Sequence, residues 1–401
     1  MATKYRKISP VERSYLFHDR YNEQPLVLCA VAEGYGEFDL PQWKRAIKKA
    51  AAVHPGVRLI KKGRSGFSQW CVDDFEIPVT LIEDSLWDGK GPENADFLRG
   101  KLSPDTGKVF EVLLIKSDKL RVVFRLHHGV GDATSIRYIV RDIFIALKGG
   151  EPIGSNSTLC DVDFLDRVES PKIQPVSRDD DSPTGAAVGT SMRQQWCRRK
   201  IKASEFKLLP RVMLAIKQAA DEMNGNEDES NEARIRLTVD LRRHLPLTTC
   251  TTANCSGAID VNVSRQSSVL DVTRQIKASL KINKELARPS PLLVFLARWL
   301  PTKFHGMKDK AILQLHDEGK YMRLGTVSKV NRINLDDYSA AGFTAETLFG
   351  IPPASKLLPF FISLSPVADG VEMVVGMPEL LANEGRLEKF THKIAAIVEA
   401  C

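Results

Sequence analysis

The sequence predicts an α/β (α+β) protein made of two lobes, each a mixed β-sheet with helices. The chain has 401 residues, and a single hydrophobic core rarely grows beyond about 250–300 residues. Strand-like and helix-like patterns are mixed along both halves. Ser, Pro, Gly, Asp and Thr are concentrated between the halves. We therefore expect an N-terminal lobe over 1–167, a flexible crossover linker over 168–191 and a C-terminal lobe over 192–401.

The first lobe begins with a strand and a helix. An apolar run at 26–31 is typical of a buried strand. Asp39 can cap the helix that follows, and Pro41 is tolerated in its first turn. The segment 54–58 is expected to end that helix and lead into a strand, with His54 in a structural role. The apolar positions of the helix are Leu40, Trp43, Ala46, Ile47 and Ala50.

A strand pair and a second helix follow. Strands are predicted at 109–115 and 121–126, joined by the polar turn 116–119. Apolar residues at spacings of three, four and seven predict a helix over 133–147. Between strand and helix stands the string His-His-Gly-Val-Gly-Asp at 127–132, whose glycines permit a tight backbone path. Because histidine titrates near neutral pH, an imidazole held at such a turn is a natural general base.

The second lobe shows the same mixture of patterns. Strands are predicted at 234–240, 257–263, 322–330, 358–364 and 371–376. Helices are predicted around 204–222, at 269–285 and at 291–300, and a polar loop over 224–232. The C-terminal segment forms a last helix with one apolar face of Leu387, Phe390, Ile394 and Ile397. Trp43, Trp196 and Trp299 lie in apolar patterns and are interpreted as core residues.

The composition narrows the possible partners. The net charge of +7 is mild and spread out, and few aromatics lie among the basic residues, so no nucleic acid is expected. Basic runs such as 198–202 are interpreted as solvated surface, with attraction of an anionic partner as the alternative. No run approaches the roughly 18 apolar residues of a membrane span. The first ten residues are polar, so we expect no secretory signal.

The seven cysteines are scattered along the chain and odd in number. Cys250 and Cys255 stand apart from other ligand types, so no metal site is expected. A reducing, cytoplasmic location is the default expectation for such a pattern.

The string at 127–132 resembles the HHxxxD signature of the chloramphenicol acetyltransferase-like superfamily. That group includes CoA-dependent acyltransferases, plant-type BAHD acyltransferases and nonribosomal-peptide condensation domains. Ser135 matches the small-residue continuation of condensation domains, although Ala133 stands in place of their usual glycine. The segments 54–58, 239–242 and 254–257 are similar to the HPxLR, V-N/D-L-R and GNxxG segments of these proteins.

Two departures from the superfamily patterns narrow the assignment. The DFGWG motif of the plant-type subgroup is absent, so we do not expect an alcohol acyltransferase of that subgroup. The segment 328–331, Ser-Lys-Val-Asn, stands where some relatives have SNLG. Ser328 is therefore kept as a candidate contact to the substrate or the oxyanion.

The resemblance implies two chloramphenicol-acetyltransferase-like lobes with an active site in a tunnel between them. His128 would be the general base that activates a hydroxyl or amine of a small-molecule acceptor. The acyl donor would be a thioester co-substrate, either acyl-CoA or the phosphopantetheine arm of an acyl carrier protein. Backbone N–H groups of residues 129–132 would contribute to the oxyanion site. No metal or bound cofactor is required, and members of the fold can act as monomers.

The resemblance assigns structural roles to the neighbours of His128. Asp132 would form a salt bridge with Arg242, or failing that with Arg243, and His127 would pack or hydrogen-bond within the turn. With Gly131 and Ser135, these residues would support the site.

The same residues also allow purely structural interpretations. Both histidines could be purely structural, Asp132 could serve only as the cap of the following helix, and Arg242 could lie at the surface. A non-transferring member of the fold, which binds or cyclises a small molecule in the tunnel, is the alternative function.

Overall fold

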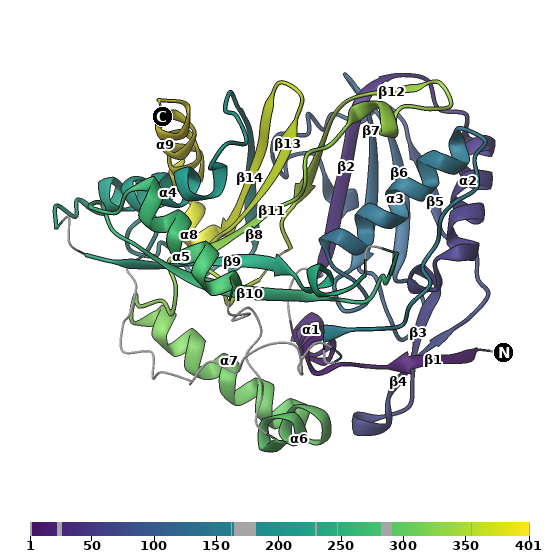
Figure 1. Ribbon diagram of the computed structural model, residues 1–401, viewed down its shortest axis with the longest axis horizontal. Coiled ribbons are helices and arrows are strands. Elements are labelled where there is room, and N and C mark those ends of the chain that lie inside the picture. The colour runs from purple at the N-terminus through teal and green to yellow at the C-terminus, as the bar shows by residue number, and fades with distance from the viewer. Residues whose placement is uncertain are drawn as a thin grey trace.

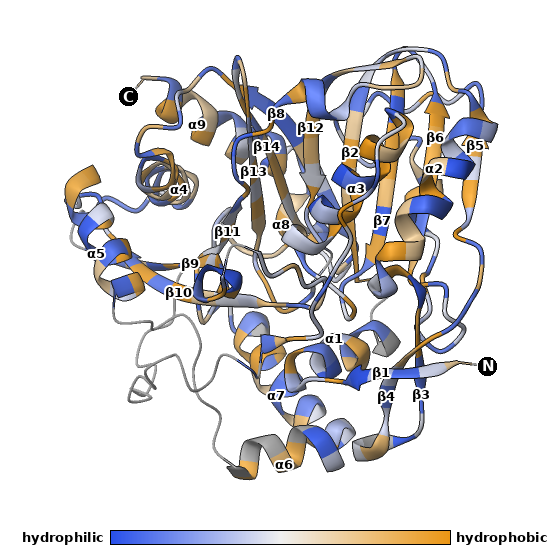
Figure 2. Ribbon diagram, turned by 45° about the vertical axis from the view of Figure 1, so that its right-hand side comes forward, coloured by the Kyte–Doolittle hydropathy of each residue, from blue (hydrophilic) through white to orange (hydrophobic). Residues whose placement is uncertain are grey.

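The computed structural model describes residues 2–21, 26–161, 163, 182–228, 231–246, 248–281, 291–353 and 355–400. It is a mixed α/β protein with two large sheets, as the sequence predicts, and a third, smaller sheet (Figure 1). Hydrophobic residues are concentrated in the strands of the two large sheets and on the helices against them (Figure 2).

The first sheet has the strand order β12-β2-β7-β6-β5. Its strands are β2 (Val27–Gly36), β5 (Val79–Ile82), β6 (Phe110–Lys116), β7 (Leu120–His127) and β12 (Phe343–Ile351). Neighbouring strands are antiparallel except β5 and β6, which are parallel. Helices α2 (Leu40–Val53) and α3 (Ala133–Leu147) pack on one face. Asp39 caps α2 by accepting a hydrogen bond from Gln42 N at 3.0 Å.

Strand β12 comes from the second half of the sequence but completes the first sheet. It pairs antiparallel with β2, from Phe343 opposite Gly36 to Ile351 opposite Cys29. The two sheets are therefore not divided at one point of the sequence. No strand was predicted here, because its apolar residues alternate only briefly before Gly350. The boundaries 1–167, 168–191 and 192–401 stay predictions.

The second sheet has the order β10-β9-β11-β13-β14-β8. Its strands are β8 (Gln194–Ile201), β9 (Ala233–Asp240), β10 (Ser256–Val263), β11 (Gly325–Lys329), β13 (Phe361–Val367) and β14 (Gly370–Pro378). Helices α4 (Leu208–Asn224), α5 (Val269–Lys281) and α9 (Arg386–Ala400) pack on its outer face, and the short α8 (Glu379–Ala382) precedes α9. On α9, Val398 is fully buried, whereas the predicted Ile397 is only partly buried.

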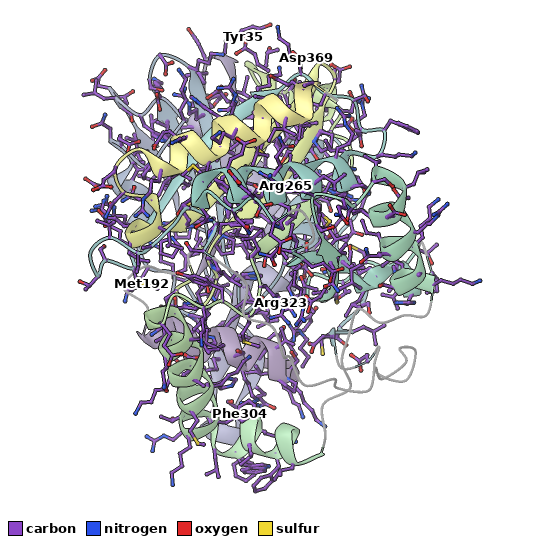
Figure 3. All side chains as sticks on the ribbon, turned by 90° about the vertical axis from the view of Figure 1, so that its left-hand side faces the viewer. Tyr35, Met192, Arg265, Phe304, Arg323 and Asp369 are labelled. Carbon is purple, nitrogen blue, oxygen red and sulfur yellow. The ribbon has the colours of Figure 1, made fainter. Side chains whose placement is uncertain are left out.

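A third element group lies at the lower end of the molecule in Figure 1. The sheet β1-β4-β3 is formed by Thr3–Lys7, Gln69–Val72 and Leu59–Lys62. Helix α1 (Pro10–Tyr21) packs against α6 (Pro291–Trp299) and α7 (Pro301–Asp317). Figure 3 shows α7, with Phe304 labelled, at the opposite end of the molecule from Tyr35 and Asp369. No helix was predicted at α7, because Gly306 and the run 308–310 interrupt the apolar pattern there.

Short 3-10 turns complete the described secondary structure. They lie at Pro55–Arg58, Ser65–Phe67, Asp96–Arg99, Leu241–His244 and Leu335–Tyr338.

The two large sheets meet through the faces that carry no helices. An apolar cluster there combines Trp196 and Val374 of the second sheet with six residues of the first: Val31, Leu113, Ile115, Val123, Phe349 and Ile351. Beside it, Arg198 pairs with Glu372 (Nε–Oε2 2.9 Å) and with Glu33 (Nη1–Oε2 3.2 Å). Arg198 is thus part of the contact between the sheets, and the interpretation of its basic run as solvated surface is wrong at this residue.

The predicted linker is described only in part. Residues 168–181 lie outside the described residues. Residues 182–184 are buried, and Thr184 Oγ1 donates to Leu381 O at 2.7 Å. Val188 N donates to Leu380 O at 2.9 Å. The interval 182–191 is therefore docked on the second lobe, which corrects the expectation of a flexible linker there. Within the described ranges, no helix has the length and apolarity needed to cross a membrane.

Candidate active site

The turn that carries His128 is fastened to the neighbouring strand. His128 N donates to Leu26 O at 2.8 Å, one residue before β2 begins. Val130 N donates to His127 O at 3.0 Å and closes the turn. The end of β7 and the start of α3 are thereby held against the first residues of β2.

Gly129 and Gly131 serve this turn through their small size. Neither has a positive φ, so the tight path predicted for the turn depends on the missing side chains and not on a left-handed backbone. A Cβ on Gly131 would lie 2.9 Å from Ser135 Cβ and from Leu126 Cδ2. A Cβ on Gly129 would lie 3.0 Å from the ring of His127. Side chains at these positions would push apart the groups that form the site.

The tautomer of His128 follows from its hydrogen bond. Nδ1 lies 3.1 Å from Gly131 O, and because a carbonyl oxygen only accepts, Nδ1 carries the proton. The lone pair is therefore on Nε2, which has no hydrogen-bond partner among the described residues. The Tyr15 ring stacks on the imidazole with centroids 4.0 Å apart and an interplanar angle of 20°.

The surroundings of His128 favour the neutral ring. Burial lowers the pKa of His128 below its ordinary value of 6.5, against the opposing effects of the Gly131 hydrogen bond and the charge of Asp132. Burial also raises the pKa of Tyr15 to about 12, so the stacked ring is an uncharged phenol at neutral pH. The neutral imidazole is thus the favoured form of His128 at pH 7.

His127 is held in place on both sides of its ring. It is fully buried, and its Nδ1 accepts from Gly129 N at 3.0 Å. Its Nε2 lies 3.5 Å from Asp19 Oδ2, and Asp19 Oδ1 accepts from Leu26 N at 3.1 Å. Both ring nitrogens of His127 therefore face groups of the fold, which suits an anchoring role.

Asp132 points into a set of donors. Its Oδ1 accepts from Ser135 N at 2.9 Å, which caps α3. Its Oδ2 accepts from Cys255 N at 2.7 Å and from Arg242 Nη1 at 3.0 Å. Asp132 is therefore both the cap of α3 and the partner of Arg242, two readings that the sequence left open.

Arg242 connects the second lobe to the turn. It is 7% exposed. Besides Asp132, it reaches Ser135 Oγ through Nη2 at 3.0 Å and Thr251 O through Nε at 3.0 Å. Its neighbour Arg243 instead donates to Leu280 O in an exposed position. The structure brings Arg242 rather than Arg243 to Asp132 and excludes a surface position for it.

The arrangement can be compared with known proteins. No family model and no curated protein matches this sequence. Solved structures do match along essentially the whole chain. The condensation domain of the Monacolin K polyketide synthase MokA is similar with a TM-score of 0.65 and 10% identity, covering 100% of this chain and 98% of that domain. The chain has the condensation-domain fold.

Two further structures share this fold. The epimerization domain from the third module of tyrocidine synthetase B matches with a TM-score of 0.63 and 13% identity, over 100% of this chain and 97% of that domain. A mutant starter condensation domain of rhizomide synthetase RzmA, solved in complex with C8-CoA, matches with a TM-score of 0.65 and 11% identity, over 99% of this chain and 94% of that chain. At such low identity the likeness defines the fold.

Within this condensation-domain fold, two side chains at the site were not predicted. Tyr15 lies on α1, for which no helix was predicted. The signal was present, because Ser9 and Glu12 form a capping box in which each side chain accepts from the other's backbone N–H. Asn254 is fully buried and donates from Nδ2 to His128 O at 3.2 Å. The segment 254–257 was recognised as similar to the GNxxG segment, but no contact between Asn254 and His128 was predicted.

The predicted oxyanion donors of the turn 129–132 need correction, and the role predicted for Ser328 stays a prediction. The N–H groups of Gly129, Val130 and Asp132 are engaged by His127 Nδ1, His127 O and Ser135 Oγ. In the part of the chain that the structure describes, only the N–H of Gly131 in the turn 129–132 has no partner, so the turn as a whole is not an oxyanion hole. Ser328 lies on β11 in register with Ser363, and no described interaction joins it to His128.

Proposed function

We propose that this protein is an acyltransferase that moves an acyl group from a thioester to a hydroxyl or amine of a small molecule. The thioester is acyl-CoA or an acyl group on a carrier protein, and His128 is the general base. The observation that carries the proposal is the neutral His128 ring. Its Nδ1–H donates to Gly131 O, and its Nε2 is free to accept a proton.

The proposed reaction has two steps. His128 Nε2 takes the proton of the acceptor as its oxygen or nitrogen attacks the thioester carbonyl carbon. The tetrahedral intermediate then collapses, the carbon–sulfur bond breaks, and the leaving thiolate takes the proton back from His128. The free N–H of Gly131 is the candidate donor to the oxyanion, since its neighbours are occupied. Asp132, His127, Ser135 and Arg242 act as positioning residues.

The fold supports this class of reaction. The similarity covers nearly all of the chain and includes a starter condensation domain whose solved structure holds C8-CoA. The choice between ester and amide products, and between CoA and a carrier protein, stays open in the proposal. The cytoplasmic location and the monomeric state predicted from the sequence also stay predictions.

One observation keeps a second function in view. An epimerization domain has the same fold, so the fold also supports chemistry other than joining two molecules. In that alternative, His128 orients or deprotonates one bound molecule in the space between the lobes, and no thiol is released.

Thiol release separates the two functions. We expect the purified protein, given a panel of acyl-CoAs with pooled alcohols and amines, to release free CoA in an acceptor-dependent manner. If neither acyl-CoA nor an acylated carrier protein yields acceptor-dependent thiol, the transferase proposal is wrong.

The pH dependence provides a second check. His128 must be neutral to accept a proton, and its pKa lies below the ordinary 6.5. We therefore expect kcat/KM for transfer to an alcohol to stay level as pH falls from 8 to about 6.5 and to decline only below that value. A profile that already declines between pH 8 and 7 would contradict the lowered pKa. Single-turnover rates at each pH would exclude slow product release as the cause.

A further inference from the structure

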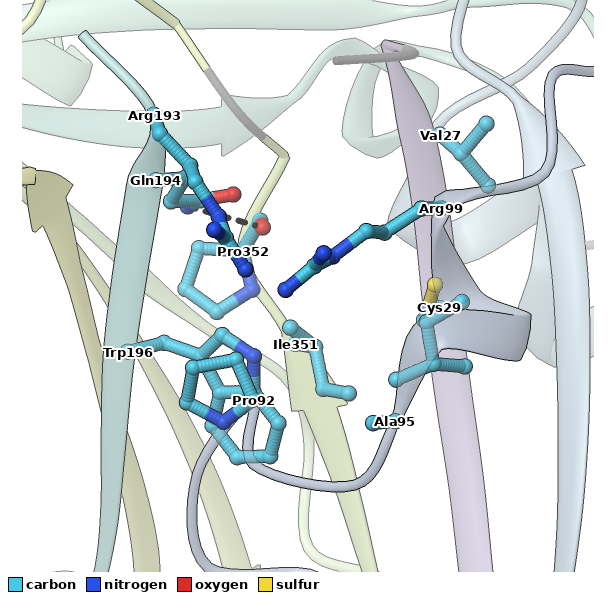
Figure 4. A pocket seen from close by; sticks show the side chains of 11 residues that line it. Val27, Cys29, Pro92, Ala95, Arg99, Arg193, Gln194, Trp196, Ile351 and Pro352 are labelled. Carbon is cyan, nitrogen blue, oxygen red and sulfur yellow. Dashed lines mark hydrogen bonds between the residues drawn. The ribbon is translucent and has the colours of Figure 1, made fainter. Parts of the chain in front are cut away.

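A pocket lies between the two large sheets (Figure 4). It encloses about 590 Å³ of empty space, its open mouth included. The first lobe contributes Val27, Cys29 and the loop residues Pro92 and Ala95, and the second contributes Arg193, Gln194 and Trp196. Ile351 and Pro352, at the end of β12, complete the wall where the sheets meet.

The inner wall of this pocket is apolar. Trp196, 5% exposed, presents its ring beside Pro92 and Ile351 (Figure 4). The interpretation of Trp196 as a core residue is therefore incomplete, because the ring also lines a space that a ligand can enter. Gln194 does not offer its amide N–H groups to such a ligand, since Nε2 donates to Pro352 O at 3.2 Å and to Pro353 O at 3.3 Å. Apolar walls of this kind suit the hydrocarbon part of a small molecule.

The pocket begins next to the proposed base. The Cα of Val27 is paired with that of His127 across β2 and β7. The residue before it, Leu26, accepts the backbone N–H of His128 at 2.8 Å. Cys29 is two residues further along β2, or roughly 7 Å at the rise of a strand. Val27 thus joins the wall of the pocket to the strand end that precedes His128.

Two guanidinium groups point toward one another across the pocket (Figure 4). Arg99 ends the turn Asp96–Arg99, and Arg193 directly precedes β8. The ion pair of Arg99 is with Asp96, whose side chain is 83% exposed. The guanidinium of Arg193 has no ion pair or hydrogen bond with any residue that the structure describes. Two cations that converge without a buried counter-charge form an attractive site for an anion.

We propose that this pocket binds a substrate that has an apolar body and a carboxylate, with the carboxylate between Arg193 and Arg99. The inference deepens the proposed function, on which it rests for the statement that the bound molecule is a substrate of His128. The apolar body lies against Trp196 and Ile351, and the planar guanidinium groups donate hydrogen bonds to the two carboxylate oxygens.

The position favours a carboxylate over the phosphate of a thioester donor. The pocket starts at Val27, beside the turn where the thioester carbonyl would react. A pantetheine arm separates the thioester from its phosphate by a long flexible chain, which would carry the phosphate away from this place. The anion therefore belongs to a reacting molecule, the acceptor or the acyl group.

Calorimetric titration with matched ligands tests the proposal directly. Hexanoate, hexanol, hexylamine and hexyl phosphate share one apolar chain and differ in the head group. We expect hexanoate to bind at least about tenfold more tightly than hexanol or hexylamine. Arg193→Gln is expected to remove about tenfold of the hexanoate affinity and to change the hexanol affinity by less than about twofold. Arg99→Gln, at a side chain 43% exposed, should cost about two- to threefold.

Arg274→Gln is the matched control, because Arg274 is 77% exposed on α5 and does not line the pocket. The proposal is overturned if Arg193→Gln weakens hexanoate binding no more than Arg274→Gln does. It is equally overturned if hexyl phosphate binds about tenfold more tightly than hexanoate, which would assign the pocket to the donor's phosphate. Since binding is measured without turnover, these results are independent of whether the protein releases thiol.

Discussion

Replacing His128 by alanine is expected to lower the rate of acyl transfer by about 10²- to 10⁴-fold, the usual contribution of a general base. The ring is the group at the turn whose nitrogen can take a proton, because Nε2 is free and the ring is neutral. The measurement is acceptor-dependent thiol release under single-turnover conditions. A loss in kcat with little change in KM would place the effect on the chemical step.

The controls for this experiment are available in the chain. His392, exposed on α9 of the second lobe, is a matched histidine, and His392→Ala should leave the rate unchanged. His128→Gln separates positioning from proton transfer, because its amide can still donate to Gly131 O but is not a base. Both His128 variants should melt close to the wild type. Turnover retained within about threefold in a folded His128→Ala protein would refute the assignment.

Removing the partner of Asp132 is expected to have the largest effect on stability. Arg242→Ala should lower the free energy of unfolding by about 3–5 kcal/mol, because it leaves a buried carboxylate without its counter-charge. The side chains of both residues are 5% exposed. Thr251 O would also lose its donor Nε, and Ala253 O would lose the shorter of its two hydrogen bonds. Asp132→Asn should destabilise similarly, since its NH2 group cannot replace an oxygen that accepts from Ser135 or Cys255.

Urea denaturation measures this effect, with Arg243→Ala as the neighbouring control. Arg243 makes an exposed hydrogen bond to Leu280 O, so its loss should cost less than about 1 kcal/mol. An Arg242→Ala variant as stable as Arg243→Ala would contradict the buried pair. Activity is expected to fall with stability, because Asp132 caps the helix that begins beside His128.

The pair also has a defined pH dependence. Burial alone would raise the pKa of Asp132, but the charge and hydrogen bonds of Arg242 outweigh it and hold the pKa below the ordinary 3.8. A carboxyl with a lowered folded-state pKa stabilises the fold above its unfolded pKa and loses this contribution as pH falls through the folded value. The stability difference between wild type and Arg242→Ala should therefore be largest at neutral pH and shrink as the pH is lowered. The variant's buried carboxyl, whose pKa burial raises once Arg242 is gone, takes up a proton first, and the wild type loses its contribution below about pH 4.

Much of the secondary structure of the first lobe could be predicted from local sequence patterns. Asp39 and Pro41 placed the start of α2, and the apolar spacing over 133–147 matched α3. The strands on either side of the turn 116–119 were found because β-branched and apolar residues dominate them. Such features depend on residues near one another in the chain, so a single sequence reveals them.

Other features depend on contacts between distant residues. Nothing near β12 in the sequence shows that it will pair with β2, some 300 residues earlier (Ile351 opposite Cys29). The stacking of Tyr15 on His128 joins α1 to the turn. The pocket with Arg99 and Arg193 exists only where the two sheets meet.

By itself, the sequence determined the α/β class, the strand–turn–helix that presents His128, and the residue types of the site from 127 to 135. The tertiary structure decided which nitrogen of His128 is free, that Asp132 both caps α3 and pairs with Arg242, and that the N–H groups of the turn are mostly occupied. The physical reason is that hydrogen-bond direction and burial depend on neighbours brought together only by folding. A local pattern records propensity, whereas the protonation state and charge pairing of a side chain are set by everything packed around it.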